Sequence, residues 1–225
     1  VYLNGPRYLY LYATQWSIEL NISVNSATMD STGLQVAVAH TEGVFVINTE
    51  SRSITSYYNI SSSVDTVHWD SEGDLWYGLY GLERRAIEYR NGNLTGEQTE
   101  PHIQPMTAMD IISGDRIVTG GRDNLVKVSN QEGIVERTLT GFSSYPSKIL
   151  HDGADNLIVG CDNGDIFRFN MSDWSREESS VSSGQNIISI SFTEDGDILV
   201  GTQNGKLHQL NGSTLTEETV YSASG

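Results

Sequence analysis

A segment of about forty residues occurs five times along this chain, and this repeat limits the fold more than any other feature. Each copy contains a short apolar run, an acidic turn with glycine, a second apolar run that ends in a small residue, a tight turn and a third apolar run. The small residues lie 39, 42, 40 and 41 residues apart and are Ala39, Gly78, Gly120, Gly160 and Gly201. A constant period of this length indicates stacked units that share one core.

Within each copy the apolar residues follow the period of a β-strand. Residues 188–192 alternate between large apolar side chains and serine, which is typical of a strand with one buried face. The pairs Asn163-Gly164 and Asn204-Gly205 are typical of tight hairpin turns, because both central residues of the favoured turn need a positive φ. Segments 53–60 and 218–221 supply a fourth strand. We find no convincing amphipathic helix and therefore expect four strands in each copy.

We predict an all-β fold, a β-propeller of four-stranded blades, because such units bury both faces when they stack radially around an axis. The 225 residues hold five complete repeats and an N-terminal half-blade, so the complete propeller would have six or more blades. With only four prolines and no low-complexity linker, we expect a single domain over residues 1–225. Its expected parts are the half-blade 1–22 and the blades 23–60, 61–103, 104–142, 143–184 and 185–225.

Several turns resemble those of known propellers. FTEDGDILV from Phe192 and WDSEGDLWY from Trp69 resemble the F-S-P-D-G-x-x-L turn of the WD-repeat and quinoprotein-like propellers. GGRDNLVKVSN from Gly120, followed by LTGFSSYPSKI from Leu139, is similar to a WD repeat that continues into the next one. KLHQLNGSTL from Lys206 is more similar to the quinoprotein type. The resemblance spans nearly the whole chain and implies a β-propeller, while the subfamily stays unassigned.

The N-terminal segment begins in the middle of a blade. Residues 5–13 correspond to a third strand and residues 16–22 to a fourth. The sequence YLYLY at 8–12 would leave a long apolar strand edge, which isolated proteins usually protect. We therefore expect another protein, or the rest of a larger polypeptide, to supply strands that complete this half-blade, unless the two chain ends are brought side by side.

The charge balance excludes several kinds of partner. Asp and Glu number 29 against 13 Lys and Arg, which gives a net charge of -16 and a pI near 4.5. A nucleic-acid surface and binding to anionic membranes are therefore disfavoured. Only three of the basic residues are lysine. This composition fits either drift or adaptation to high salt, where screening shortens charge repulsion to about 3 Å at 1 M.

Cysteine and sequon counts bear on the compartment. The single cysteine, Cys161, excludes an internal disulfide and a cysteine-rich zinc site. No apolar run reaches the length of a membrane span, and we expect no signal segment at the N-terminus. Chance predicts about three N-glycosylation sequons, and the five observed favour an extracellular or particle-surface protein over a cytoplasmic one. They begin at Asn21, Asn59, Asn93, Asn170 and Asn211.

Two metal interpretations compete with a purely structural one. The acidic turns 70–74, 152–156 and 194–197 offer oxygen ligands for calcium, but none matches the twelve-residue calcium loop, and turn chemistry alone predicts their recurrence. The five histidines show no metal-binding spacing, so zinc would require loops that converge in space. We therefore predict no metal and no cofactor, and we regard Cys161 as an incidental small residue. No nucleophile elbow or phosphate-binding loop is present in the sequence.

The turn at 79–85 is longer than its counterparts and carries the only adjacent basic pair of the chain. In propellers, the turns between second and third strands share a face with the loops that link successive blades, and the resemblance implies that this face binds partners. Aromatic and arginine residues on it would form a binding hot spot, with a solvated loop as the alternative. The candidate residues are Tyr80, Arg84, Arg85, Arg122, Phe142, Tyr145 and Pro146.

The leading functional hypothesis is a non-enzymatic scaffold that binds another protein through propeller loops, in a salt-rich, extracellular or particle-surface setting. The alternative is a propeller enzyme, or a protein that binds a small ligand or carbohydrate, with its site at the mouth of the central channel. An enzyme would bring perturbed titratable groups together in a pocket, whereas a scaffold would present aromatic and arginine residues without such convergence.

Overall fold

The structure is a computed structural model. It describes residues 2–3, 8–11, 16–19, 22–60, 63–79, 85–90, 93–99, 101–182 and 184–222, and for residues before 22 and between 85 and 99 it describes the backbone alone. Within these residues, 23 strands form five four-stranded sheets and one three-stranded sheet, and no helix is present. The prediction of an all-β fold built from four-stranded blades is confirmed.

Every sheet is an antiparallel meander, in which each strand pairs with the strand that follows it in sequence. The turns supply the positive φ that such tight connections need, since Gly164 has a φ of 89° and Gly205 a φ of 78°. Both pairs predicted as hairpin turns thus join the second and third strands of their sheets. Asn124 adopts a φ of 56° at the corresponding turn of another blade.

The backbone forms two compact units, residues 1–100 with 131–133, and residues 101–130 with 134–225. The first unit begins with the three-stranded sheet, whose strands are β1 (Tyr2–Leu3), β2 (Tyr8–Leu11) and β3 (Trp16–Glu19). Strands β2 and β3 correspond to the two strands predicted for the half-blade. The short strand β1, which sequence analysis missed, pairs with β2 at Leu9 and Tyr10.

Two blades complete the first unit. The first blade consists of β4 (Val24–Met29), β5 (Gln35–His40), β6 (Gly43–Asn48) and β7 (Ser53–Asn59). The second blade consists of β8 (Thr66–Trp69), β9 (Leu75–Leu79), β10 (Arg85–Arg90) and β11 (Asn93–Thr99). The strands β4 and β8, the first of each blade, lie next to each other.

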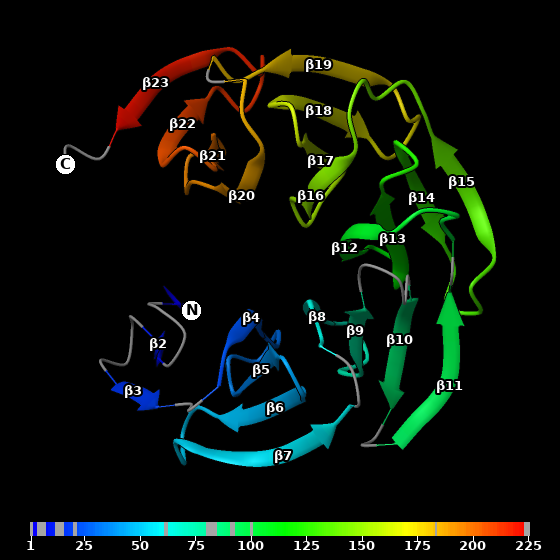
Figure 1. Ribbon diagram of the computed structural model, residues 1–225, viewed down its shortest axis with the longest axis vertical. Helices are drawn as coiled ribbons and strands as arrows, with labels where there is room; N and C mark the ends of the chain where they lie inside the picture. The colour runs from blue at the N-terminus through cyan, green and yellow to red at the C-terminus, as the bar shows by residue number, and fades with distance from the viewer. Residues whose placement is uncertain are drawn as a thin grey trace. The chain divides into compact units, whose positions relative to one another are not determined.

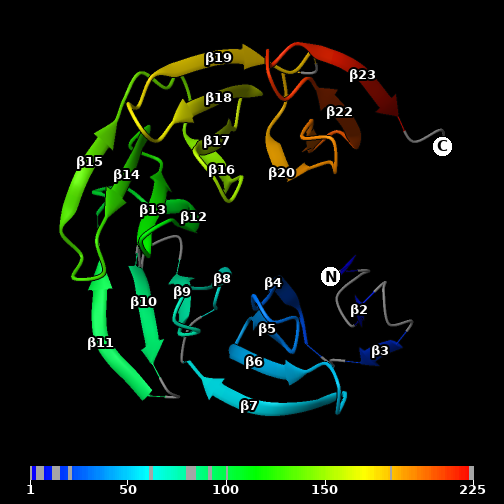
Figure 2. The ribbon, with the colours of Figure 1, turned by 180° about the vertical axis from the view of Figure 1, so that it is seen from behind.

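The second unit contains three blades (Figures 1 and 2). The first of them consists of β12 (Met106–Ile112), β13 (Arg116–Gly121), β14 (Leu125–Ser129) and β15 (Val135–Leu139). The next consists of β16 (Pro146–His151), β17 (Asn156–Cys161), β18 (Asp165–Asn170) and β19 (Arg176–Ser180). The last consists of β20 (Ile187–Phe192), β21 (Ile198–Thr202), β22 (Lys206–Leu210) and β23 (Glu217–Ser222). The first strand of each blade lies next to the first strand of the following blade, β12 beside β16 and β16 beside β20. The fourth strand of each blade lies at the other edge of its sheet.

The small residue that ends the second strand makes room for the blade that follows. A Cβ atom on Gly120 would lie 2.7 Å from the Cβ atom of Pro146, and one on Gly160 would lie 2.7 Å from the Cγ2 atom of Ile187. Pro146 and Ile187 are buried first residues of the next blades. Close packing between blades therefore explains why a glycine marks the forty-residue period at these positions.

Alternating strand direction places the connections of the second unit at two ends of its blades. One end, called the loop end here, carries the turns between second and third strands and the loops that enter each new blade. Backbone hydrogen bonds join these segments, since the Arg122 amide donates to the Pro105 carbonyl at 2.9 Å and the Asp162 amide donates to the Tyr145 carbonyl at 3.1 Å. Side chains from separate loops are thereby held close together.

Candidate functional site

Arg122 and Tyr145 form a cation–π pair at the loop end of the second unit. Arg122 lies in the turn between β13 and β14 and is exposed, and its guanidinium carbon lies 5.2 Å from the centroid of the Tyr145 ring. The Tyr145 hydroxyl donates a hydrogen bond of 2.7 Å to Oδ1 of Asp162, in the turn between β17 and β18. This hydrogen bond, together with burial and the negative charge of Asp162, raises the pKa of Tyr145. The ring is thus held in place under the arginine.

Ile103 adds an apolar side chain to this end. It lies in the loop that leads into β12 and is 79% exposed, the largest value among the exposed large hydrophobic residues of the described region. The same loop contributes the Pro105 carbonyl that accepts the Arg122 amide. Ile103, Arg122 and Tyr145 are called the loop cluster from here on.

A buried histidine fixes the loop that carries Ile103. His102 is 3% exposed, and its Nδ1 lies 2.9 Å from Oδ1 of Asp123, while its Nε2 lies 3.0 Å from the Thr119 hydroxyl. The Asp123 carboxylate can only accept, so Nδ1 carries the proton and Nε2 accepts from Thr119. Burial lowers the pKa of His102 and so favours the neutral ring, although the Asp123 carboxylate acts in the opposite direction.

The glycine before Arg122 is a requirement of this arrangement. A Cβ atom on Gly121 would lie 2.5 Å from Nδ1 of His102 and 2.8 Å from Oδ1 of Asp123. Any larger residue would therefore break the contact between the histidine and the carboxylate.

The structure brings together only two of the seven residues predicted to bind a partner. Arg122 and Tyr145 meet as described. Phe142 is 7% exposed and packs edge-on against Phe167 at 4.9 Å between ring centroids, within a hydrophobic core. Pro146 is buried at the start of β16.

The remaining predicted residues belong to the long turn of the second blade. Tyr80 and Arg84 lie outside the described residues, and Arg85 is described only as the first backbone position of β10. Sequence analysis missed Ile103. Its signal was an apolar residue in a proline-bounded polar loop, outside the alternating pattern of the strands.

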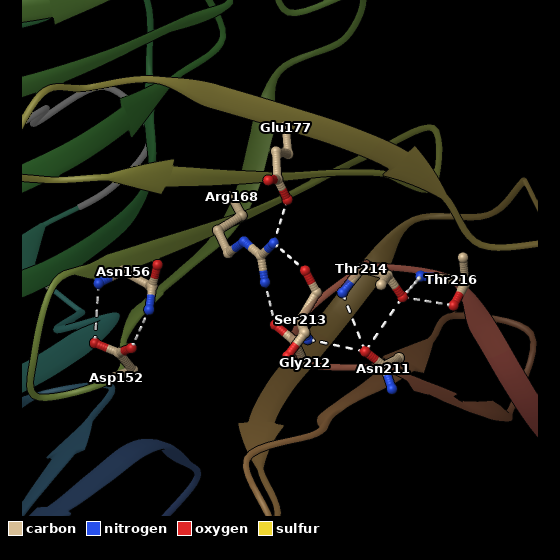
Figure 3. A network of polar contacts seen from close by, with 9 residues as sticks. All are labelled: Asp152, Asn156, Arg168, Glu177, Asn211, Gly212, Ser213, Thr214 and Thr216. Atoms are coloured by element: carbon tan, nitrogen blue, oxygen red, sulfur yellow. Dashed lines mark hydrogen bonds and ion pairs between the residues drawn. The ribbon is translucent and has the colours of Figure 1, made fainter.

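A second feature of the unit is a cleft of about 290 Å³ between its last two blades, at the end opposite the loop cluster. Ile158, Phe192 and Ile198 form its apolar wall, and Arg168 and Asp152 border it. Arg168 donates to the carbonyls of Gly212 and Ser213 and pairs with Glu177 (Figure 3). The guanidinium therefore binds the turn of the next blade through these hydrogen bonds and is not free for a ligand.

Two of the three acidic turns use an aspartate carboxylate to close the turn, whereas in the third the Thr193 hydroxyl accepts the Asp197 amide at 3.0 Å. Oδ1 of Asp70 accepts the amides of Glu72 and Asp74 at 3.1 and 2.8 Å. Oδ1 of Asp152 accepts the amides of Ala154 and Asn156 at 2.8 and 3.0 Å. These bonds are those of turn-capping aspartates. Across the described residues, no group of three or more His, Cys, Asp or Glu side chains is arranged to hold a metal ion.

The other reactive groups of the described region are spread over the blades. His208 contacts Glu217 at 3.1 Å in the last blade, far along the chain from His102. Cys161 is buried at the end of β17, and burial raises the pKa of its thiol to about 12, so the thiolate form is rare near neutral pH. In the part of the chain that the structure describes, no helix has the length and apolarity of a membrane span.

Comparisons with known proteins give matches in structure alone. No family model matches the sequence, and no curated protein matches it. A chain of the mitotic checkpoint complex has a TM-score of 0.77 at 16% identity, over 96% of this chain and 72% of that one. The WD40 β-propeller domain of Doa1 has a TM-score of 0.75 at 12% identity, over 89% and 69%.

U3-55K has a TM-score of 0.79 at 13% identity, over 91% of this chain and 66% of that one. Identities this low establish the fold alone. Together with the four-stranded meanders described above, they show that the chain has the β-propeller fold of the WD40 type.

Proposed function

We propose that this propeller is a non-enzymatic scaffold that binds another protein through the loop cluster. The observation that carries the proposal is the 79% exposure of Ile103 at the end of the unit where Arg122 forms its cation–π pair with Tyr145. A single exposed apolar residue is ordinary on a protein surface. An exposed isoleucine on a loop joined to that of a paired arginine and tyrosine has the composition of an interface hot spot, because arginine and tyrosine are enriched there.

The rigidity of the loop cluster supports this proposal. His102 holds the loop of Ile103 through Asp123 and Thr119, and Asp162 holds the ring of Tyr145. Loops that are already ordered lose little conformational entropy when a partner binds. These hydrogen bonds therefore favour recognition by a preformed surface.

The enzymatic alternative has less support from the described residues. His102 has both ring nitrogens in hydrogen bonds to neighbouring side chains, and Cys161 is buried with a raised thiol pKa. Arg168, which borders the cleft, is committed to Gly212, Ser213 and Glu177. These groups are buried or already bonded within the fold, whereas Ile103 and Arg122 of the loop cluster present their side chains to solvent.

We also propose that the surface is adapted to a salt-rich setting. The outer strands place exposed Glu177, Glu178 and Glu218 at the blade edges, and the chain carries a net charge of -16. Salt would screen the repulsion between these carboxylates.

Site-specific photocrosslinking tests the scaffold proposal. A benzoylphenylalanine at Gln104, exposed in the loop of Ile103, is irradiated in an extract of the organism that makes this chain. The control carries it at Asp195, exposed in the turn between β20 and β21 at the other end of the blades. We expect a protein adduct at position 104 that is absent at position 195 and is lost with Arg122→Ala. Equal adducts at both positions, adducts indifferent to Arg122, or no adduct at position 104 would refute the proposal.

A further inference from the structure

We propose that Arg122 recognises a carboxylate of the partner and that Ile103 contacts an aliphatic side chain next to that carboxylate. The inference rests on the proposed function and names the chemistry of the partner: an acidic residue adjacent to an aliphatic one in an exposed peptide segment.

The first step concerns the hydrogen-bond donors of Arg122. The cation–π contact with Tyr145 places the guanidinium carbon over the ring and leaves the N–H groups of Arg122 for other partners. Among the described residues, the Arg122 side chain has neither a hydrogen bond nor an ion pair. Arg168 and Arg176 differ, because both donate to backbone carbonyls and pair with glutamates. The Arg122 fork is therefore available to a planar anion from another molecule.

The second step concerns the charge of the ligand. The guanidinium would repel a lysine or arginine of the partner. The nearby Asp123 and Asp162 are each in a hydrogen bond, to His102 and Tyr145, yet they remain negative charges close to the site. A phosphate dianion would feel their repulsion about twice as strongly as a carboxylate, in a chain whose net charge is -16. One carboxylate per arginine is the better match.

The third step concerns Ile103. Its loop is tied to the Arg122 turn by the hydrogen bond from the Arg122 amide to the Pro105 carbonyl, and by that between His102 and Asp123. The isoleucine and the arginine therefore present their side chains from two joined loops. A partner that buries Ile103 would also bring a neighbouring residue toward Arg122, and burying an aliphatic contact there contributes affinity that a carboxylate alone lacks.

Fluorescence anisotropy with synthetic peptides provides the test on the 225-residue chain. The probes are labelled nine-residue peptides of Gly and Ser with a central Leu-Glu or Glu-Leu pair. Matched peptides carry Gln or phosphoserine in place of Glu. We expect the Glu peptides to bind at least tenfold more tightly than the Gln peptides, in line with a charge-assisted hydrogen bond. Arg122→Ala should remove this difference in affinity. Ile103→Ala should weaken the binding of the Glu peptides and of the Gln peptides by the same factor.

Arg137→Ala is the matched control. Arg137 also forms a cation–π pair, with its guanidinium carbon 5.0 Å from the Trp174 centroid, but it lies on the outer strand β15. We expect its loss to leave peptide binding unchanged. Equal binding of Glu and Gln peptides, binding of the phosphoserine peptide alone, or binding of none would overturn the inference. The photocrosslink at position 104 separates the two proposals, because a partner adduct without peptide binding refutes the acidic ligand and leaves the scaffold standing.

Discussion

The hydroxyl of Ser147 donates a hydrogen bond of 2.7 Å to the backbone carbonyl of Ile187, 40 residues further along the chain. This distance in sequence is one repeat. Thr107 bonds the carbonyl of Pro146 in the same way, and Asn25 bonds that of Val64 at 2.8 Å. Each donor lies at a register shift near the start of the first strand of its blade, where a β-bulge interrupts the ladder. The bulge therefore turns one polar side chain of each of these blades toward the backbone of the next.

Removal of the Ser147 hydroxyl should destabilise the second unit. Ser147→Ala leaves the carbonyl of buried Ile187 without this donor, so we expect the free energy of unfolding to fall by about 1–3 kcal/mol. Urea denaturation measures the change. Ser213→Ala, at an exposed position in the turn between β22 and β23, is the control and should change stability by less than about 0.5 kcal/mol. Equal stabilities of the two variants would contradict the proposed role of the bulge.

A methyl group on Gly160 should also weaken the contact between blades. Gly160→Ala places a Cβ atom 2.7 Å from Cγ2 of fully buried Ile187, so we expect a loss of about 1–3 kcal/mol. If this clash is the cause, Ile187→Ala should cost less in the Gly160→Ala background than in the wild type. A double-mutant cycle measured by chemical denaturation gives the coupling, and strict additivity would argue against the clash.

Much of this architecture follows from the sequence, but contacts between loops do not. The period of Gly120 and Gly160 predicts blades, because strand packing repeats along the chain. The alternation at 188–192 predicts the strand correctly but not its buried face, since Ile188 is 49% exposed. The exposure of Ile103 and the burial of Phe142 are different, since both lie in loops whose depth depends on side chains from other segments. Without a periodic pattern, an apolar loop residue can be core or surface.

The bulge position illustrates the same limit. Asn25, Thr107 and Ser147 follow the forty-residue spacing, yet nothing in the sequence says that their side chains reach the next blade. Ile188, at the corresponding register shift of β20, is 49% exposed and cannot donate such a bond. The isoleucine itself sets this blade apart, but only the structure shows that Asn25, Thr107 and Ser147 bond the next blade.

Protonation of His102 should destabilise the fold in mild acid. Burial lowers the pKa of His102, so near pH 6 the unfolded chain binds more protons than the folded chain, and stability falls as the pH falls through about 6.5. His40 contributes with the same sign, since burial also lowers its pKa. Urea unfolding at pH 7.5 and 5.5 should show a larger drop for the wild type than for His102→Gln. The carboxyls with lowered pKa, Asp152, Asp173 and Glu217, titrate below this window. Equal drops would exclude His102 as a contributor.

Salt should stabilise this chain. Repulsion among 29 acidic residues against 13 basic ones is screened as the Debye length falls to about 3 Å at 1 M. We expect the melting temperature to rise by about 5 °C or more between 50 mM and 2 M KCl, measured by circular dichroism. A variant with Glu136→Gln and Glu194→Gln, at two exposed positions, should show a smaller rise. A wild-type melting temperature that stays constant or falls with added KCl would contradict the proposal of a salt-adapted surface.

Arg168 should act as a clamp between the last two blades. Its side chain is 13% exposed and donates to the carbonyls of Gly212 and Ser213, so Arg168→Ala should lower the free energy of unfolding by about 1.5–3 kcal/mol. Arg168→Lys should recover only part of this loss, because one ammonium cannot reproduce the planar fork. Hydrogen exchange of the turn amides at 213–214 should accelerate in Arg168→Ala more than exchange elsewhere in the blade.

The paired glutamate gives the control for this last experiment. Glu177 is 60% exposed, so its ion pair with Arg168 is screened by water and contributes little. Glu177→Gln should therefore leave both the unfolding free energy and the exchange at 213–214 close to the wild type. If Glu177→Gln proved as damaging as Arg168→Ala, the ion pair within the blade, rather than the bonds to the next blade, would be the function of the arginine.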